Sequence, residues 1–89
     1  MKMETENLRK KGRALPAVVR VGKAGVTDSL VEEIDKHLKK KKLIKVKFLK
    51  SATTEASVRE LAEKISSETK SEIIMVMGLT AVFYREKRK

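Results

Sequence analysis

The segment Gly22-Lys23-Ala24-Gly25 is the clearest place for chemistry, because two glycines frame a lysine between a β-branched run and an amphipathic stretch. A loop that leaves a strand and enters a helix brings free backbone N–H groups and the positive end of the helix dipole to one place. Glycines let that backbone approach an anion closely, and Lys23 adds a mobile cation. The pattern predicts a phosphate-binding loop. A turn that uses its glycines for geometry alone is the alternative that the motif leaves open.

The remaining polar residues form no catalytic or metal-binding pattern. The only histidine, His37, stands among lysines at a spacing that suits no metal site, and the chain has no cysteine. Glu32, Glu33 and Asp35 are expected to pair with neighbouring lysines, and no nucleophile has a matching base. We therefore expect no enzyme activity, no cofactor and no metal ion.

The charge of the chain indicates a polyanionic partner. Twenty-two Lys and Arg against twelve Asp and Glu give a formal net charge of +10, and each phosphate that a basic residue neutralises releases counterions. The net charge is +9 over residues 1–53, −2 over 54–72 and +3 over 73–89. This segregation predicts a basic face that joins the loop to Arg9, Lys10, Arg13, Lys45 and Lys47, with the acidic segment turned away. Lysines that only solvate the protein are the alternative.

Hydrophobic spacing and helix signals predict the elements that position these residues. Helices are expected at 7–14, 28–42 and 55–69, and strands at 17–21, 43–49, 72–77 and 81–85. Thr27 is a good cap for the second helix, and Ser57 with Glu60, or Thr54, for the third. Residues 1–6 are expected to be a flexible N-terminus, 7–85 a single domain and 86–89 a basic tail.

The order α-β-α-β-α-β-β predicts an α/β fold, an open two-layer sandwich with a mixed four-stranded sheet. Lys45 and Lys47 alternate with apolar residues, so helices are expected to cover only one side of that sheet. Of Phe83 and Tyr84, one should be buried and the other on the open side, too few aromatics for a base-stacking platform. The predicted core comprises Val19, Val21, Leu30, Ile34, Leu38, Ile44, Val46, Leu61 and Ile65.

No apolar run approaches the ~18 residues that a membrane span requires, and the N-terminal residues lack the apolar stretch of a signal peptide. We expect a soluble, cytoplasmic protein.

The stretch from Val18 to Phe48 resembles the YhbY-like, or CRM (chloroplast RNA splicing and ribosome maturation), domain family. That family combines a strand, a Gly-Lys-x-Gly-Leu/Val-Thr loop, an acidic amphipathic helix and a Leu-Ile-Lys-Val strand, which here are Gly22 to Thr27, Leu30 to Leu38 and Leu43 to Val46. The closing Val82-Phe83-Tyr84-Arg85 is similar to the family's Leu-Tyr-Arg, so the likeness runs from about Leu8 to Arg85. Ala24 stands where the family often has Asn, and Leu79 where it has a basic residue.

The resemblance implies a fold akin to the C-terminal domain of translation initiation factor three, and RNA binding with a role in maturation of the large ribosomal subunit. We expect a monomer that contacts ribosomal RNA or a pre-ribosomal large subunit and no membrane. Two alternatives stay open. One is an architectural nucleic-acid-coating protein of the Alba type, and the other a polybasic binder of acidic proteins or a membrane surface through Lys39 to Lys42.

Overall fold

A computed structural model describes residues 2–86, with side chains from Glu6 onward. In this part of the chain the elements are α1 (Lys2–Ala14), β1 (Ala17–Val21), α2 (Asp28–Lys40), β2 (Leu43–Phe48), a short 3-10 helix η1 (Lys50–Thr53), α3 (Val58–Thr69), β3 (Glu72–Met77) and β4 (Thr80–Tyr84). The predicted element order is confirmed, whereas η1 was not expected and α1 begins at Lys2 rather than at Asn7. Of the expected tail at 86–89, residues 87–89 lie outside the described residues.

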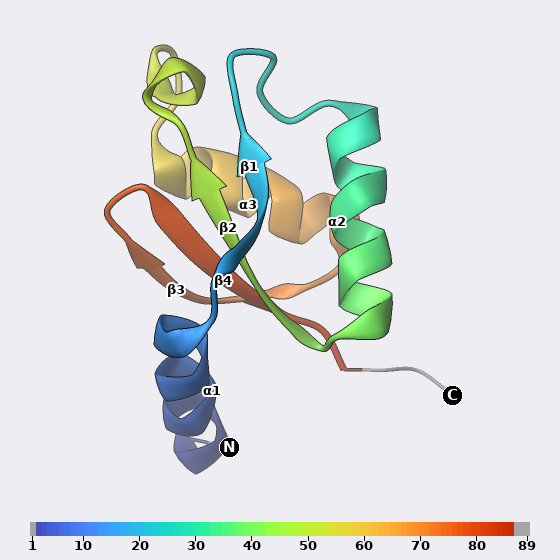
Figure 1. Ribbon diagram of the computed structural model, residues 1–89, viewed down its shortest axis with the longest axis vertical. Helices are drawn as coiled ribbons and strands as arrows, with labels where there is room; N and C mark the ends of the chain where they lie inside the picture. Colours follow the sequence, from blue (N-terminus) through green and yellow to red (C-terminus); the bar gives the residue numbers. More distant parts are fainter. Residues whose placement is uncertain (1, 87–89) are drawn as a thin grey trace.

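The strands form one mixed sheet in the order β1-β2-β4-β3. β1 runs parallel to β2, as a strand–helix–strand connection requires, and β4 runs antiparallel to both β2 and β3. Figure 1 shows α1 below the twisted sheet, α2 to the right of it and α3 behind it. The predicted α/β class with a mixed four-stranded sheet is therefore confirmed for the described residues.

The main core lies between the sheet and the pair α2 and α3. It contains all nine core residues predicted from the sequence, together with Phe48, Ala52, Ala62, Ala81 and Phe83. Local signals place the two helices: the Thr27 hydroxyl accepts from the backbone N–H of Leu30 at 3.1 Å, and Ser57 and Glu60 form a reciprocal capping box.

The expectation that helices cover only one side of the sheet is wrong for α1, which packs against β2 and β3 on the side opposite α2 and α3. Val82 shows this placement. It is only 1% exposed although strand alternation turns it away from the core residues Ala81 and Phe83. A Cβ built on Gly12 would lie 2.9 Å from a Val82 methyl, so the helix touches the sheet through its glycine. α1 packs on an apolar patch on that side of the sheet. The residues of α1 alone form no pattern that predicts this contact.

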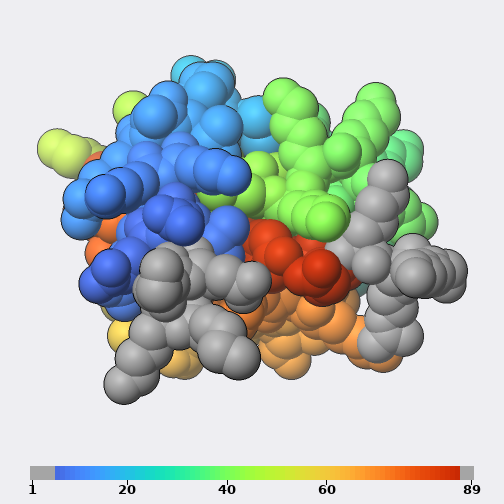
Figure 2. All heavy atoms as spheres, turned by 90° about the horizontal axis from the view of Figure 1, so that it is seen from below, coloured from blue at the N-terminus to red at the C-terminus, as the bar shows by residue number. Residues whose placement is uncertain are grey.

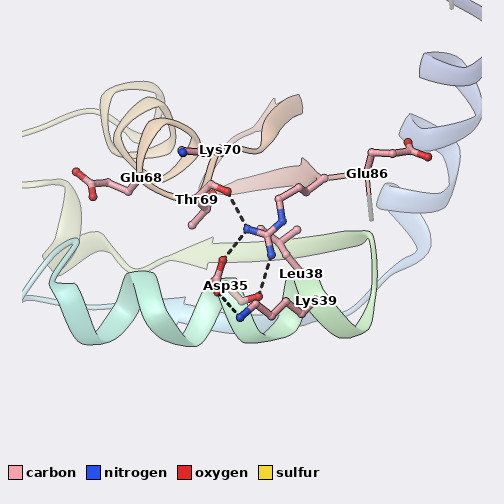
Figure 3. Close-up of a pocket in the computed structure, with 8 residues that line it drawn as sticks. Asp35, Leu38, Lys39, Glu68, Thr69, Lys70 and Glu86 are labelled. Carbon is pink, nitrogen blue, oxygen red and sulfur yellow. Dashed lines mark hydrogen bonds and ion pairs between the residues drawn. The ribbon is translucent and has the colours of Figure 1, made fainter. Parts of the chain in front are cut away.

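Arg85, just after β4, connects the end of this strand to both core helices, and Figure 3 labels its partners Asp35 and Thr69. The guanidinium donates to the carboxylate of Asp35 in α2 at 2.6 Å and to the carbonyl oxygen of Thr69 in α3 at 2.8 Å. The hydrogen bond from Arg85, assisted by Lys39 at 3.4 Å, lowers the pKa of Asp35 below its ordinary value. The contacts of Arg85 are thus structural, and they lie on the side of the sheet away from α1.

Candidate nucleic-acid interface

The predicted loop is a tight turn at the carboxyl end of β1. The N–H of Gly25 donates to the carbonyl oxygen of Gly22 at 2.9 Å, which leaves Lys23 and Ala24 exposed at the corners. Gly25 has a φ of 74°, a conformation that side chains disfavour, so its glycine is required by the turn itself.

Gly22 is different. Its φ is not in the left-handed region, and a Cβ placed there would meet only Leu49 Cδ1 at 3.8 Å, an ordinary van der Waals contact. Neither folding nor packing requires a glycine at this position. A glycine that the fold does not need, beside an exposed lysine, is what a close backbone approach to a ligand would use.

α2 begins at Asp28, with only Val26 and the N-cap Thr27 between it and this turn. The N–H of Leu30 is taken by the Thr27 hydroxyl and that of Val31 by the Thr27 carbonyl, which leaves the amides of Asp28 and Ser29 without an acceptor inside the helix. These amides and the helix dipole favour an anion. The carboxylate of Asp28, exposed in the first turn, already adds a negative charge at that end and offsets part of this attraction.

Two strands extend the positive charge away from the turn. Lys45 and Lys47 of β2 lie on the α1 side of the sheet, and the register places Arg20 of β1 beside Lys47. Lys47 and Arg20 are both exposed. Because β1 and β2 are parallel, these two residues lie toward the end of the sheet that carries the Gly22 turn. We call Lys23, Arg20, Lys47 and Lys45 the basic track.

Lys45 is only partly available to a ligand. It is half-buried, and its ammonium group donates to the carbonyl oxygen of Arg13 at 3.1 Å, so it also caps the end of α1 against the sheet. Lys47, with its neighbour Arg20, is the freer part of the track.

The three predicted basic residues of α1 do not share one surface. With 100° per residue, Arg9 and Arg13 fall on one flank of the helix beside Gly12, whereas Lys10 falls on the side away from the sheet. All three are exposed. The structure therefore brings Arg9 and Arg13 near the track through the contact of Lys45 with Arg13, and leaves Lys10 apart from it.

The sequence interpretation missed two basic residues near the turn. Arg20 was predictable, because the buried Val19 and Val21 on either side of it force its side chain to the opposite face. Lys50 begins η1, next to Leu49, whose side chain lies beside Gly22. η1 has no strong sequence signal, so this neighbour could be found only in the fold.

The acidic segment is turned away, as the charge pattern predicted. Leu61, Ala62 and Ile65 of α3 pack in the core on the side of the sheet opposite the basic track. Glu60 and Glu63 are exposed on that outer side. Among the described residues no group of three or more His, Asp or Glu side chains could hold a metal ion, and no helix is long and apolar enough to cross a membrane.

Comparison with known proteins assigns the chain to a class and then to a family. It is similar along its whole length to the solution structure of the hypothetical protein SAV1595 from Staphylococcus aureus, with a TM-score of 0.78, 28% identity and coverage of 91% of that chain. The small α/β domain seen here therefore recurs in a second protein. The structure of that protein is described as that of a putative RNA binding protein.

The family model of the CRS1 / YhbY (CRM) domain matches residues 1–85, and the chain belongs to this family. It is 32% identical over 82 residues to the "Probable RNA-binding protein YqeI" of Bacillus subtilis, covering 92% of this chain and 83% of that protein. It is 36% identical over 80 residues to the "Probable RNA-binding protein MJ0652" of Methanocaldococcus jannaschii, covering 90% of this chain but 59% of that protein.

Proposed function

We propose that this protein binds structured RNA, with its backbone at Gly22 to Gly25 against a phosphate and its basic track along the neighbouring phosphates. The observation that carries the proposal is the turn itself. It exposes Lys23 and Ala24 at the end of β1, leaves room for a Cβ at both glycines and lies at the same end of the sheet as Arg20 and Lys47. The RNA-binding names of two relatives support RNA as the polyanion.

Such contacts with phosphates position the protein on the RNA and recognise the shape of the RNA rather than its base sequence. Backbone N–H groups and lysines on phosphates carry no base information, so selectivity would come from the form of a folded RNA. We propose RNA of the large ribosomal subunit, in a precursor particle, as that target, which the family resemblance supports. The protein would act there without a catalytic step, as a monomer in the cytoplasm. Co-sedimentation of the protein with large-subunit precursors in gradients, and its loss on RNase treatment, would test the target.

The replacement Gly22→Ala tests the role of the turn. The fold accepts a methyl group at Gly22, so thermal unfolding should remain at the wild-type value. A phosphate held against this backbone would lose contact, and affinity for a folded rRNA fragment should fall roughly tenfold, the value of one charge-assisted hydrogen bond. Ala24→Asn, on an exposed corner of the same turn, is the matched control and should bind normally. Wild-type affinity for Gly22→Ala would mean that the loop is only a turn.

A second experiment separates the basic track from total charge. Arg20→Ala with Lys47→Ala, and Arg59→Ala with Lys64→Ala, each remove two exposed cations, the first pair from the track and the second from α3. The first double variant should weaken binding and reduce the slope of log K against log salt by roughly 1.4 to 1.8, whereas the second should leave both nearly unchanged. Equal effects would refute a localised face. Tighter binding to duplex DNA than to folded RNA at one salt concentration would favour the Alba-type alternative.

A further inference from the structure

A concave surface separate from the basic track lies on the flank of α1 away from Arg9 and Arg13. It is a groove of about 650 Å³ between α1, the α2–β2 turn and the end of β4. Its apolar wall consists of Leu8, Leu15, Leu43 and Tyr84, all half-buried. Figure 2 shows the elements around it on one face, with α1 in blue, the α2–β2 turn in green and the end of β4 in red. The volume lies in the range of small-molecule sites.

The rim of this groove is cationic. Lys11 comes from α1, and Lys41 and Lys42 come from the α2–β2 turn on the other side, all three exposed. The phenol of Tyr84 donates to the carboxylate of Glu86, which holds the ring in place, and Glu86 is not one of the residues that line the groove. An apolar, aromatic wall between lysines is complementary to a flat apolar group that carries negative charge at its edge.

We propose that this groove receives one unstacked nucleobase of the bound RNA, with its ring on Tyr84 and its flanking phosphates on Lys11, Lys41 and Lys42. This inference rests on the proposed function and adds to it a contact with an unpaired nucleotide. A base at this site needs only one aromatic ring, because the leucine side chains supply the rest of the surface. With phosphates on Arg9 and Arg13, α1 would contact RNA on both flanks.

Other occupants fit the rim less well. An apolar helix from a partner protein would cover the half-buried wall but leave three lysines unpaired. A membrane surface would attract the lysines but presents its headgroups in a plane, whereas this site is a hollow bounded on two sides by helix and turn. The phosphodiester-linked base matches both the wall and the rim.

The chain has one tyrosine and no tryptophan, so its intrinsic emission reports on Tyr84 alone. We would titrate the wild-type protein with a short oligouridine and with an abasic ribose-phosphate oligomer of the same length, following binding by anisotropy of a labelled end. Both should bind, the oligouridine more tightly, and only the oligouridine should quench Tyr84, because stacking needs a base. Equal quenching and equal affinity would overturn the groove proposal while leaving phosphate binding intact. Failure of both oligomers and of folded rRNA to bind would overturn the proposed function as well.

Two substitutions at the same position sharpen the test. Tyr84→Phe keeps the ring and should bind an RNA hairpin with unpaired loop bases as the wild type does. Tyr84→Leu keeps an apolar side chain without a ring and should lower that affinity roughly five- to hundredfold, the range for losing one stacking partner. Affinity for a fully paired RNA duplex should be the same in both variants, which also controls for folding. Equal loss with both variants would overturn the proposal, and so would quenching of Tyr84 by anionic lipid vesicles but not by oligouridine.

Discussion

Replacing Gly12 by alanine tests how closely α1 is seated on the sheet. The added Cβ would lie 2.9 Å and 3.0 Å from the two methyl groups of Val82, closer than such atoms approach in practice. Val82 is 1% exposed and β-branched, so its methyl groups cannot rotate aside. The helix or the strand must therefore move.

Two opposing effects set the magnitude. Alanine is a better helix former than glycine by about 1 kcal/mol, which favours the variant. Overpacking a well-packed contact costs about 1–3 kcal/mol, which opposes it. We expect a net loss of roughly 1 kcal/mol, equivalent to a melting temperature about 4–8 °C lower for a domain of this size.

The assay is a double-mutant cycle with Val82→Ala, read by thermal and denaturant unfolding. Removing the valine methyl groups costs stability by itself, but it also creates the space that the new methyl group on α1 needs, so the two changes should be less than additive by about 1–3 kcal/mol. The reasoning is refuted if Gly12→Ala raises stability by about 1 kcal/mol, as helix propensity alone predicts, and the cycle shows no coupling.

Three further predictions follow from individual contacts. The pKa of Asp35 is lower in the folded protein than in the unfolded chain. Its pairing with Arg85 therefore stabilises the fold above the unfolded pKa, and this stability is lost as the pH falls through the folded pKa. On acidification below about pH 4, the melting temperature of Asp35→Asn should consequently decline less than that of the wild type. Lys23→Ala should weaken RNA binding modestly, whereas aspartate at both 23 and 24 should weaken it much further with little change in melting temperature, and native binding by the latter would contradict a phosphate at the turn. Asp28→Asn removes the acid beside the turn and should raise RNA affinity about two- to fivefold, as measured by anisotropy at fixed salt; unchanged affinity would place the phosphate elsewhere.

Signals that act within a few residues were sufficient to predict most of the fold. The Thr27 cap, the Ser57–Glu60 box and the alternation in β2 are local, and each is confirmed. Because the two-residue period of the strands and the 3.6-residue period of the helices also fix which side chains face inward, all nine predicted core residues are in the core.

Contacts between distant residues could not be predicted in this way. The sequence shows Gly12 only as a weak point in a helix, since nothing near it in the chain indicates Val82 as a neighbour. Arg85 meets Asp35 fifty positions away, and the groove draws its wall from three separate elements. The site was thus predictable where it follows a loop motif and strand alternation, whereas the position of α1, and the groove beside it, required the fold.

The separation of charge between the two sides of the sheet has a kinetic consequence. A net charge of +10, with the acidic segment on the side away from the basic track, is an uneven charge distribution that would turn the track toward an approaching polyanion before contact. Fewer encounters are then wasted in wrong orientations, and such steering raises association rates roughly 10- to 1,000-fold at low ionic strength. Added salt should consequently lower the association rate constant for RNA more than it raises the dissociation rate constant. Long-range electrostatic steering would then govern association, and direct contacts would govern dissociation.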